Sequence, residues 1–377
     1  MIKSVLIANR GEIAIRIART ARRMGIKTYV VRTAKEPEAV YLSAADAVIN
    51  FPETDGNIPE FLDIDRLVGL AREYKIDSLH PGYGYLSENA ELAERCRDNG
   101  IVFIGPSPEV IRLMGDKVAA KGIAAQSGVP MLGASQGAVH TLDEARKIAK
   151  RLGYPVIIKA VSGGGGRGMR IVHHQDELEQ LYKIATAEAQ VAFNDPSVFI
   201  EKYLENPKHI EFQIVADNYG NVVHLGEREC SIQRKHQKLM EEAPSPALDE
   251  RLRKKMAAAA VSLAKQAGYQ SLGTVEFLLD HQKHFYFMEM NTRIQVEHPV
   301  TEEITGIDLV ELQFNIAAGR KLPLRQSQIH LNGWSIECRI NAEDVQAGFS
   351  PSIGVIRQLR LPQGNHIRIE TGIAPLQ

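Results

Sequence analysis

The sequence predicts a protein of several domains in the α/β and α+β classes, and three observations support this. The chain has 377 residues, more than one hydrophobic core usually accommodates, so two or three domains are expected. Strand-like and helix-like segments alternate over residues 1–100, which predicts a parallel sheet covered on both faces. From about residue 130 a small unit of three strands and two helices follows, and from about residue 205 a third unit rich in strands.

The first unit contains the alternating elements. Residues 4–8 are an apolar, β-rich run, and Ile13, Ile17, Ala21 and Met24 recur at helical spacing within residues 12–24. Gly25 ends this helix. The later elements, in order, are strands at 28–31 and 76–80, a helix from about Ser87, a strand at 101–104 and a helix that begins at Ser107-Pro108, with Ser as N-cap.

A basic stripe marks the first helix. Arg16, Arg19 and Arg23 recur on one face of it. We expect this face to be solvated, and the alternative is a contact with a second copy of the chain.

The second unit begins with a clear helix start. Thr141 and Glu144 form a capping box, and the helix ends at Gly153. Strands are predicted at 156–160, 169–172 and 198–202, with a helix from about Asp176. The third unit contains an Ala-rich helix near residues 250–267 and a strand pair at 274–279 and 285–290.

Composition excludes several classes of protein. Hydrophobic residues make up 44% and charged residues 24% of the chain, as in a soluble enzyme, and the net charge of −1 offers no argument for binding nucleic acid or an anionic membrane. No apolar run approaches the roughly 18 residues of a membrane span. Cys96, Cys230 and Cys338 form no CxxC pair, so a reducing, cytoplasmic location without disulfides or zinc is expected.

Five polar side chains at every second position mark the most informative segment. They follow the aromatic residues 285–287 and are Glu289, Asn291, Arg293, Gln295 and Glu297. Alternate side chains of an extended chain share a face, so Glu289 and Asn291 are expected to project together. Carboxylate and amide oxygens suit magnesium, and an arginine with a further carboxylate indicates an anionic substrate and a base.

A second carboxylate strengthens the prediction of a metal site. Glu276 lies on the strand that precedes Glu289, and a hairpin would bring the two together. Glu276, Glu289 and Asn291 would then hold magnesium with ATP phosphates completing its shell. The alternative is a pair of solvated strand glutamates. The neighbouring aromatic residues argue against it, because they indicate a covered sheet.

Three further segments have both a functional and a structural interpretation. The glycine run at 163–166, with Lys159 upstream, suits phosphate oxygens, although a flexible turn is the alternative. Residues 80–84 end a predicted parallel strand, where such sheets bind ligands, and a plain turn is the alternative. The basic segment 227–244 is either part of a site or a solvated loop.

Together these segments resemble the biotin carboxylase family, the ATP-grasp component of biotin-dependent carboxylases. The resemblance extends from residue 1 to about 372. It rests on Ile-Ala-Asn-Arg-Gly-Glu-Ile-Ala at 7–14, His-Pro-Gly-Tyr-Gly-Tyr-Leu-Ser-Glu-Asn-Ala at 80–90, Met-Gly-Asp-Lys at 114–117, and the segments 158–170, 201–207, 233–244, 289–299 and 337–343. It implies the carboxylation of biotin by bicarbonate with MgATP (or MnATP) through carboxyphosphate.

The resemblance also implies roles by matching position. Lys117, Lys159 and the loop residues Gly164, Gly165 and Gly166 would hold phosphates, and Glu201, Lys202 and Leu204 would contact adenine. His209, Gln233, His236 and Glu276 would line the nucleotide pocket. Arg293, Gln295 and the Val296 backbone would seat bicarbonate, Glu297 would deprotonate it, and Lys238 would stabilise the developing charge. Arg339 would hold the biotin enolate beside Tyr83.

The implied architecture has four parts. Residues 1–115 form a Rossmann-like parallel-sheet domain, 116–130 a linker helix, 131–204 an ATP-grasp lid that excludes water, and 205–377 an antiparallel-sheet catalytic domain that is expected to be shortened. Biotin would arrive on a separate carrier protein or on a further domain, and a carboxyltransferase would accept its carboxyl group. The family also implies a homodimer. Two alternatives are another ATP-grasp carboxylate–amine ligase and an inactive nucleotide-binding or assembly module.

Overall fold

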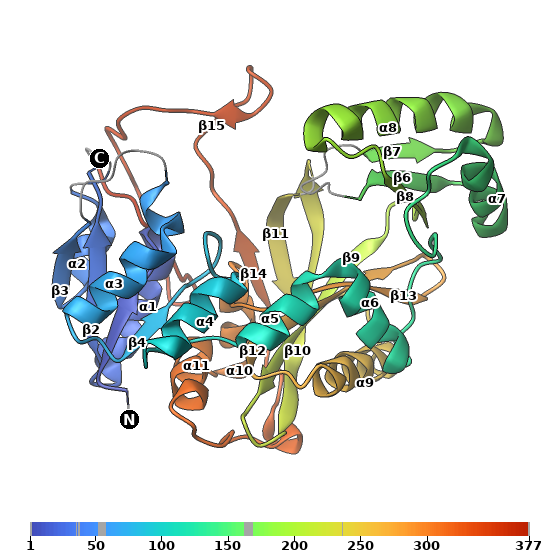
Figure 1. Ribbon diagram of the computed structural model, residues 1–377. Helices are drawn as coiled ribbons and strands as arrows, with labels where there is room; N and C mark the ends of the chain where they lie inside the picture. The colour runs from blue at the N-terminus through green and yellow to red at the C-terminus, as the bar shows by residue number, and fades with distance from the viewer. Residues whose placement is uncertain are drawn as a thin grey trace.

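The strands of the protein form four sheets. The structure is a computed structural model that describes residues 2–34, 36, 38–51, 58–161, 169–235 and 237–375. Within these ranges there are sheets of five, three, six and two strands. Figure 1 shows the three-stranded sheet and its two helices (green) standing apart from the rest of the chain, at the opposite end from the N-terminal sheet (blue).

The N-terminal sheet is parallel throughout, as the alternating pattern predicts. Its strands run in the order β3-β2-β1-β4-β5 and are β1 (Ser4–Ile7), β2 (Lys27–Arg32), β3 (Ala47–Asn50), β4 (Ser78–His80) and β5 (Val102–Phe103). The accompanying helices are α1 (Gly11–Arg23), α2 (Val40–Ala44), the 3-10 turn η1 (Glu60–Leu62), α3 (Ile64–Glu73), α4 (Ala90–Asp98) and α5 (Pro108–Gly115). Ile13, Ile17 and Ala21 are at most 2% exposed, so the predicted face of α1 is the buried one.

Two details of this unit differ from the prediction. The helix expected from about Ser87 begins at Ala90, because the side chain of Asn89 accepts a hydrogen bond from Leu92 N and caps it. Residues 40–73 contribute α2, β3 and α3, which the sequence analysis did not identify.

The carboxyl ends of β1 and β4 are joined by hydrogen bonds. Asn9 Nδ2 donates to the carbonyls of Pro81 and Tyr83, both at 2.7 Å. Gly82 has φ +64°, and a Cβ there would lie 2.8 Å from Asn9 Nδ2, so only glycine fits this turn. The loop that follows β4 is thereby held at the sheet edge where parallel sheets bind ligands.

The basic stripe on α1 packs within the chain. Arg16 is 2% exposed and pairs with Glu302 (2.6 Å) and Asp308 (3.0 Å), so the prediction of a solvated face is wrong for this residue. Arg23 pairs with Asp308 as well, and Arg19 pairs with Glu370. The carboxylates come from residues about 285 to 350 positions away, which local periodicity does not reveal.

The second unit matches its predicted elements closely. Its antiparallel sheet has the order β7-β6-β8, with β6 (Val156–Ala160), β7 (Met169–Val172) and β8 (Val198–Lys202). It is covered by α7 (Leu142–Leu152), with the predicted capping box, and by α8 (Leu178–Phe193), which follows the 3-10 turn η2 (Gln175–Glu177). Helix α6 (Lys117–Gln126), capped by Asp116, precedes this unit.

A six-stranded antiparallel sheet forms the centre of the third unit. Its order is β13-β12-β9-β10-β11-β14, with β9 (Lys208–Ala216), β10 (Val222–Arg234), β11 (Gln237–Ala243), β12 (Ser271–Leu279), β13 (Phe285–Asn291) and β14 (Ser335–Cys338). One face is apolar and packs on helix α9 (Glu250–Gln266). The other face carries buried polar side chains, because residues such as Glu211 and Glu276 alternate with the apolar ones along each strand.

A β-bulge decides which way Glu289 points. Glu276 pairs with Glu289, but the next pair is Phe277 with Phe287, so Met288 is an extra residue in β13. Strict alternation would place Glu289 on the face of buried Phe287. The bulge reverses the parity and turns Glu289 and Asn291 to the polar face.

The rest of the chain returns towards the N-terminal unit. Helices α10 (His298–Thr305) and α11 (Leu309–Ala317) lead through the 3-10 turn η3 (Gln326–Gln328) to β14, and β15 (Glu343–Asp344) pairs with β16 (Ser350–Pro351). The C-terminus lies beside the blue N-terminal elements in Figure 1. Among the described residues, no helix is both long and apolar enough to cross a membrane.

Candidate active site

Lys238 lies among three buried carboxylates on the polar face of the central sheet. Its Nζ is 2.5 Å from Glu211, 2.9 Å from Glu276 and 2.7 Å from Glu297. Burial lowers the pKa of Lys238, but the three carboxylates outweigh burial and hold this pKa well above its ordinary value. The ammonium group therefore stays charged and connects the strand residues to the segment that follows β13.

Four side chains contact the carboxylate of Glu276. Its Oε1 accepts hydrogen bonds from Lys238, from Asn291 Nδ2 (2.7 Å) and from Gln295 Nε2 (3.1 Å). Its Oε2 lies 2.7 Å from His209 Nε2. Burial raises the pKa of Glu276, but the positive charges of Lys238 and His209 outweigh burial and hold this pKa well below its ordinary value. Glu276 thus lies beside Asn291, with which it was predicted to hold a metal, and also beside Gln295.

The donor set at Glu276 and Glu289 fits a divalent cation. The two carboxylates face each other across β12 and β13. Desolvation raises the pKa of Glu289, and the charges of Glu276 and Glu88 raise it further, so a cation between the carboxylates would relieve repulsion. Asn291 turns its Nδ2 towards Glu276 and its Oδ1 towards Arg293. Metal binding by this amide would require it to turn over.

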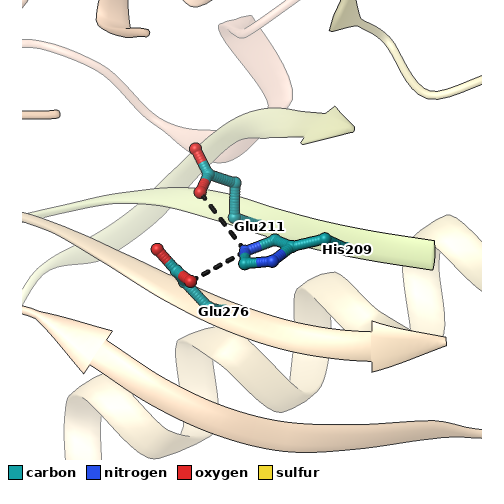
Figure 2. Close-up of side chains that lie close together, drawn as sticks. All are labelled: His209, Glu211 and Glu276. Atoms are coloured by element: carbon teal, nitrogen blue, oxygen red, sulfur yellow. Dashed lines mark ion pairs between the residues drawn. The ribbon is translucent and has the colours of Figure 1, made fainter. Parts of the chain in front are cut away.

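A second cluster of side chains, which shares Glu276 with this pair, lies beside it. Figure 2 shows His209 between Glu211 and Glu276, with ion pairs of 3.9 Å and 2.7 Å. Glu211 is already paired with Lys238 and with Arg228, which is fully buried. Burial lowers the pKa of His209, but Glu276 outweighs this and raises it above its ordinary value. We interpret this trio as part of an ion-pair network, since both oxygens of Glu211 already have cationic partners.

Arg293 is held by side chains on both sides of the site. Its Nε donates to Glu88 Oε2 (2.9 Å), its Nη1 to Gln295 Oε1 (2.7 Å) and its Nη2 to Asn291 Oδ1 (3.2 Å). The other oxygen of Glu88 accepts from Thr292 N (3.0 Å). Because β13 ends at Asn291, strand alternation does not explain the position of Arg293. Its guanidinium group lies beside the carboxylate and amide groups through these hydrogen bonds.

Glu297 lies between two cations. Its Oε1 accepts from Lys238, and its Oε2 accepts from Arg339 Nη2 at 2.9 Å. The side chain is 1% exposed, so it is shielded from bulk water. Val296, immediately before it, is half-buried, and its carbonyl lies 3.2 Å from His298 Nδ1.

The predicted nucleotide residues lie in two places. Gln233 Nε2 lies 3.1 Å from His209 Nδ1, next to the carboxylate cluster. On the lid sheet, Glu201 pairs with Lys159 and with Lys121. Burial raises the pKa of Glu201, but the two lysines outweigh burial and lower it to about 2.

The other predicted residues are less closely tied to the cluster. Lys202 donates to the carbonyls of Gly153 (3.0 Å) and Tyr154 (2.9 Å), while Leu204 is half-buried after β8 and Lys117 is exposed at the start of α6. Tyr83 donates a hydrogen bond to Glu12. Gly164, Gly165, Gly166 and His236 lie outside the described residues.

Three residues that the sequence analysis passed over complete the site. Glu88 lies within the segment 80–90 that was quoted for the family, and Glu211 follows His209 by two positions on β9, where alternation places both on one face. Arg228 lies in the basic segment 227–244, but nothing in that segment indicates its partners. These come from three other elements and are Glu211, Gln213, Thr274 and Thr301. Alternation along β9 was therefore an available signal for Glu211 but not for Arg228.

Comparison with protein families matches almost the whole chain. The family model described as "Biotin carboxylase, N-terminal domain" matches residues 1–111, and "Biotin carboxylase C-terminal domain" matches 337–375. Between them, "Carbamoyl-phosphate synthase L chain, ATP binding domain" matches residues 116–325, more than half of the chain.

The chain belongs to the biotin carboxylase family. It is 53% identical over 369 residues to the biotin carboxylase of Nostoc sp., covering 98% of this chain and 82% of that protein. It is 48% identical over 377 residues to biotin carboxylase 1 of Bacillus subtilis, covering 100% of this chain and 83% of the relative.

Solved structures of biotin carboxylases agree with this fold. A biotin carboxylase–β,γ-ATP complex from Campylobacter jejuni superposes with a TM-score of 0.93 at 47% identity, covering 100% of this chain and 84% of that one. The biotin carboxylase domain dimer of Hydrogenobacter thermophilus 2-oxoglutarate carboxylase, with MgADP and bicarbonate, gives 0.92 at 48% identity, covering 100% and 83%. The predicted ATP-grasp fold, and the prediction of an ATP- and bicarbonate-dependent biotin carboxylase of the ligase class, are confirmed.

Proposed function

We propose that Glu297 is the base that deprotonates bicarbonate in this biotin carboxylase. The observation that carries the proposal is the position of Lys238, which contacts Glu297 (2.7 Å) and Glu276 (2.9 Å) and so places a base beside residues suited to MgATP. Arg293, Gln295 and the Val296 backbone would hold the bicarbonate anion. Removal of its proton leaves an oxygen that attacks the γ-phosphorus of ATP, and ADP leaves as carboxyphosphate forms.

The negative charge that develops in this step needs cations nearby. Lys238 and Arg293 are already oriented by carboxylates, so they stabilise the charge without reorganising during the reaction. Glu276, Glu289 and Asn291 would hold magnesium, which would neutralise phosphate charge when bound. Lys117, Lys159 and the loop with Gly164, Gly165 and Gly166 would contact the phosphates.

The nucleotide would lie between the lid and the central sheet. In our proposal Glu201, Lys202 and Leu204 contact adenine, while His209, Gln233 and His236 line the pocket. Closure of the lid would exclude water, which is required because carboxyphosphate hydrolyses readily. We also propose that the chain is divided into residues 1–115, 116–130, 131–204 and 205–377, as its resemblance to the family implies.

The second half of the reaction transfers the carboxyl group to biotin. Arg339 would hold the biotin enolate with Tyr83 nearby, the biotin nitrogen would attack the carboxyl carbon, and phosphate would leave. We propose that biotin arrives on a carrier protein and that a carboxyltransferase component accepts the product. A relative from Hydrogenobacter thermophilus that is named as the small subunit of 2-oxoglutarate carboxylase supports such an assembly of components.

We also propose an oligomeric state and a cellular location. The homologous biotin carboxylase domain dimer supports a homodimer. The three cysteines are free thiols, which supports a reducing compartment such as the cytoplasm.

Replacement of the base tests the central step. Glu297→Gln should lower bicarbonate-dependent ADP release by at least about 100-fold, because an amide cannot accept the bicarbonate proton. MgATP binding, measured by calorimetry, should stay close to wild type. Glu303→Gln, an exposed carboxylate on α10, should retain full turnover. Full activity of Glu297→Gln would refute the assignment.

The same assay distinguishes the reaction from its rivals. ADP release should require bicarbonate and rise with free biotin. Turnover that depends on an amine substrate instead would indicate another ATP-grasp ligase. Tight MgATP binding without turnover would indicate an inactive module.

A further inference from the structure

Two carboxylates face each other on neighbouring strands beside the site. Glu241 on β11 is directly opposite Glu337 on β14 in an antiparallel pair, so their Cβ atoms lie about 5 Å apart. Glu241 is fully buried, and its oxygens accept no well-aligned hydrogen bond among the described residues. Oε2 of Glu337 accepts none either. Glu337 is half-buried, with its Oε2 atom shielded from solvent. Two carboxylates this close, with so few donors, are costly when both are ionised.

Sharing a proton relieves this repulsion. Burial raises the pKa of Glu241 to about 7, with Glu297 adding to the effect and Arg339 opposing it. Burial also raises the pKa of Glu337 to about 8, and the charges of Glu241 and Glu297 raise it further. The charged and titratable groups that face the pair are Glu211, Arg228, Glu297, Arg339 and Tyr83. Only two of these five are cations.

The pair acts on the site through Arg339. The Nη2 of Arg339 lies 2.6 Å from Glu241 Oε1 and 2.9 Å from Glu297 Oε2, so one nitrogen is shared between the pair and the proposed base. The Nε of Arg339 is buried and has no acceptor among the described residues. Once Glu297 takes up a proton its attraction for Arg339 weakens, and Glu241 is the remaining anion in contact with the guanidinium group.

We propose that Glu241 and Glu337 are a positioning pair for Arg339, in which Glu241 holds the guanidinium group while Glu337 carries the shared proton. This inference rests on the proposed function, in which Arg339 receives the biotin enolate. While Glu337 is protonated, only one carboxylate of the pair is negatively charged. The guanidinium group of Arg339 therefore keeps positive charge that can attract the biotin enolate. Loss of that proton adds a second negative charge, which opposes an enolate at the same place.

The pair can be tested through the biotin half of the reaction. Glu241→Gln should lower kcat/KM for free biotin by about 10-fold or more, while bicarbonate-dependent ATP cleavage without biotin changes by less than about 3-fold. Glu337→Gln imitates the protonated residue. It should keep the wild-type kcat/KM at pH 7. It should also lack the decline in kcat/KM that we expect of the wild type as pH rises through about 8.

Glu242→Gln provides the matched control. Glu242 is the next residue on β11 and pairs with Glu229 of β10, so its side chain lies on the other face of the strand. It should show the wild-type pH profile and biotin KM. An unchanged alkaline limb in Glu337→Gln, or an equal loss of both activities in Glu241→Gln, would overturn the inference. Absence of biotin-dependent turnover in the wild type would refute the proposed function instead.

Discussion

Single side chains in this site each serve several partners. Glu276 contacts Lys238, His209, Asn291 and Gln295, so the loss of one carboxylate would leave four polar groups without their partner. Arg293 is organised similarly, but its partner Glu88 comes from the loop after β4, in the N-terminal unit. The orientation of the proposed bicarbonate arginine therefore depends on a residue about two hundred positions away.

Glu88→Gln tests this dependence. Gln retains one acceptor but loses the charge-assisted hydrogen bond to Arg293, which is worth about 1.5–3 kcal/mol. We expect KM for bicarbonate to rise about 10-fold, equivalent to about 1.4 kcal/mol, with little change in KM for ATP. Steady-state ADP release at varied bicarbonate measures this. Glu91→Gln, an exposed residue of α4, should match wild type. An unchanged bicarbonate KM in Glu88→Gln would contradict the positioning role.

The raised pKa values of Glu241 and Glu337 predict a pH dependence of stability. Both lie above the ordinary value of 4.5, at about 7 and about 8. In this pair the folded state holds protons that the unfolded state has released, so the contribution of the pair to stability falls as pH rises from about 4.5 to about 8. Thermal unfolding across this range should show a flatter slope for Glu337→Gln. A slope identical to wild type would argue against the shared proton.

At the scale of elements, the bulge in β13 and the packing of α1 matter most. Met288 is the extra residue that lets Phe287 stay in the core while Glu289 faces Glu276. On α1, Arg16 is buried against α10 and α11 instead of facing water. Both features place a residue on a face that sequence periodicity alone assigns differently.

Arg16→Met should destabilise the protein through its buried carboxylates. Removal of one partner leaves Glu302 and Asp308 without this cation, and breaking a buried pair typically costs about 3–5 kcal/mol. Because Arg368 also pairs with Glu302, we expect the lower end of this range. Arg19→Met, whose side chain is about half exposed, should cost less than about 1 kcal/mol. Urea denaturation of both variants, which gives their free energies of unfolding, measures this difference. Equal losses would refute the distinction.

At the scale of the whole molecule, the C-terminal segment contacts the N-terminal unit. Glu370 pairs with Arg19 of α1, and Arg368 pairs with Glu302 and Glu370. A Cβ on Gly372 would lie 2.7 Å from Glu12 N and from Gly11 Cα, so the backbones are in close contact. The segment lies against the start of α1, where Glu12 accepts the hydroxyl of Tyr83.

Gly372→Ala should weaken this contact. The added methyl group would meet backbone atoms that cannot move aside, and overpacking of this kind costs about 1–3 kcal/mol. Limited proteolysis should cleave the C-terminal segment faster in this variant, and unfolding should require less urea. Gly354→Ala is the control, since a Cβ there meets nothing within 4 Å. Wild-type protease resistance in Gly372→Ala would show that the contact does not hold the segment.

Sequence reasoning predicted the elements with strong local signals. The parallel N-terminal sheet, the capped helix after Thr141, the lid strands and the hairpin that joins Glu276 to Glu289 all appear in the structure. These signals are local, because periodicity, capping residues and turns act over a few positions. Arg228 and the partners of Arg16 were not predictable in this way, since their contacts join distant parts of the chain.

The amino-acid sequence by itself determined the family, the reaction class and the chemical types in the site. It also indicated residues 289–297 as candidate site residues, because their identities and spacing can be recognised without knowledge of the rest of the fold. The tertiary structure alone decided which groups meet: Lys238 with three carboxylates, Glu88 with Arg293, and Glu241 with Glu337 beside Arg339. The physical reason is that charge and hydrogen bonding act through space, and only the packed sheet brings these distant positions within a few ångströms.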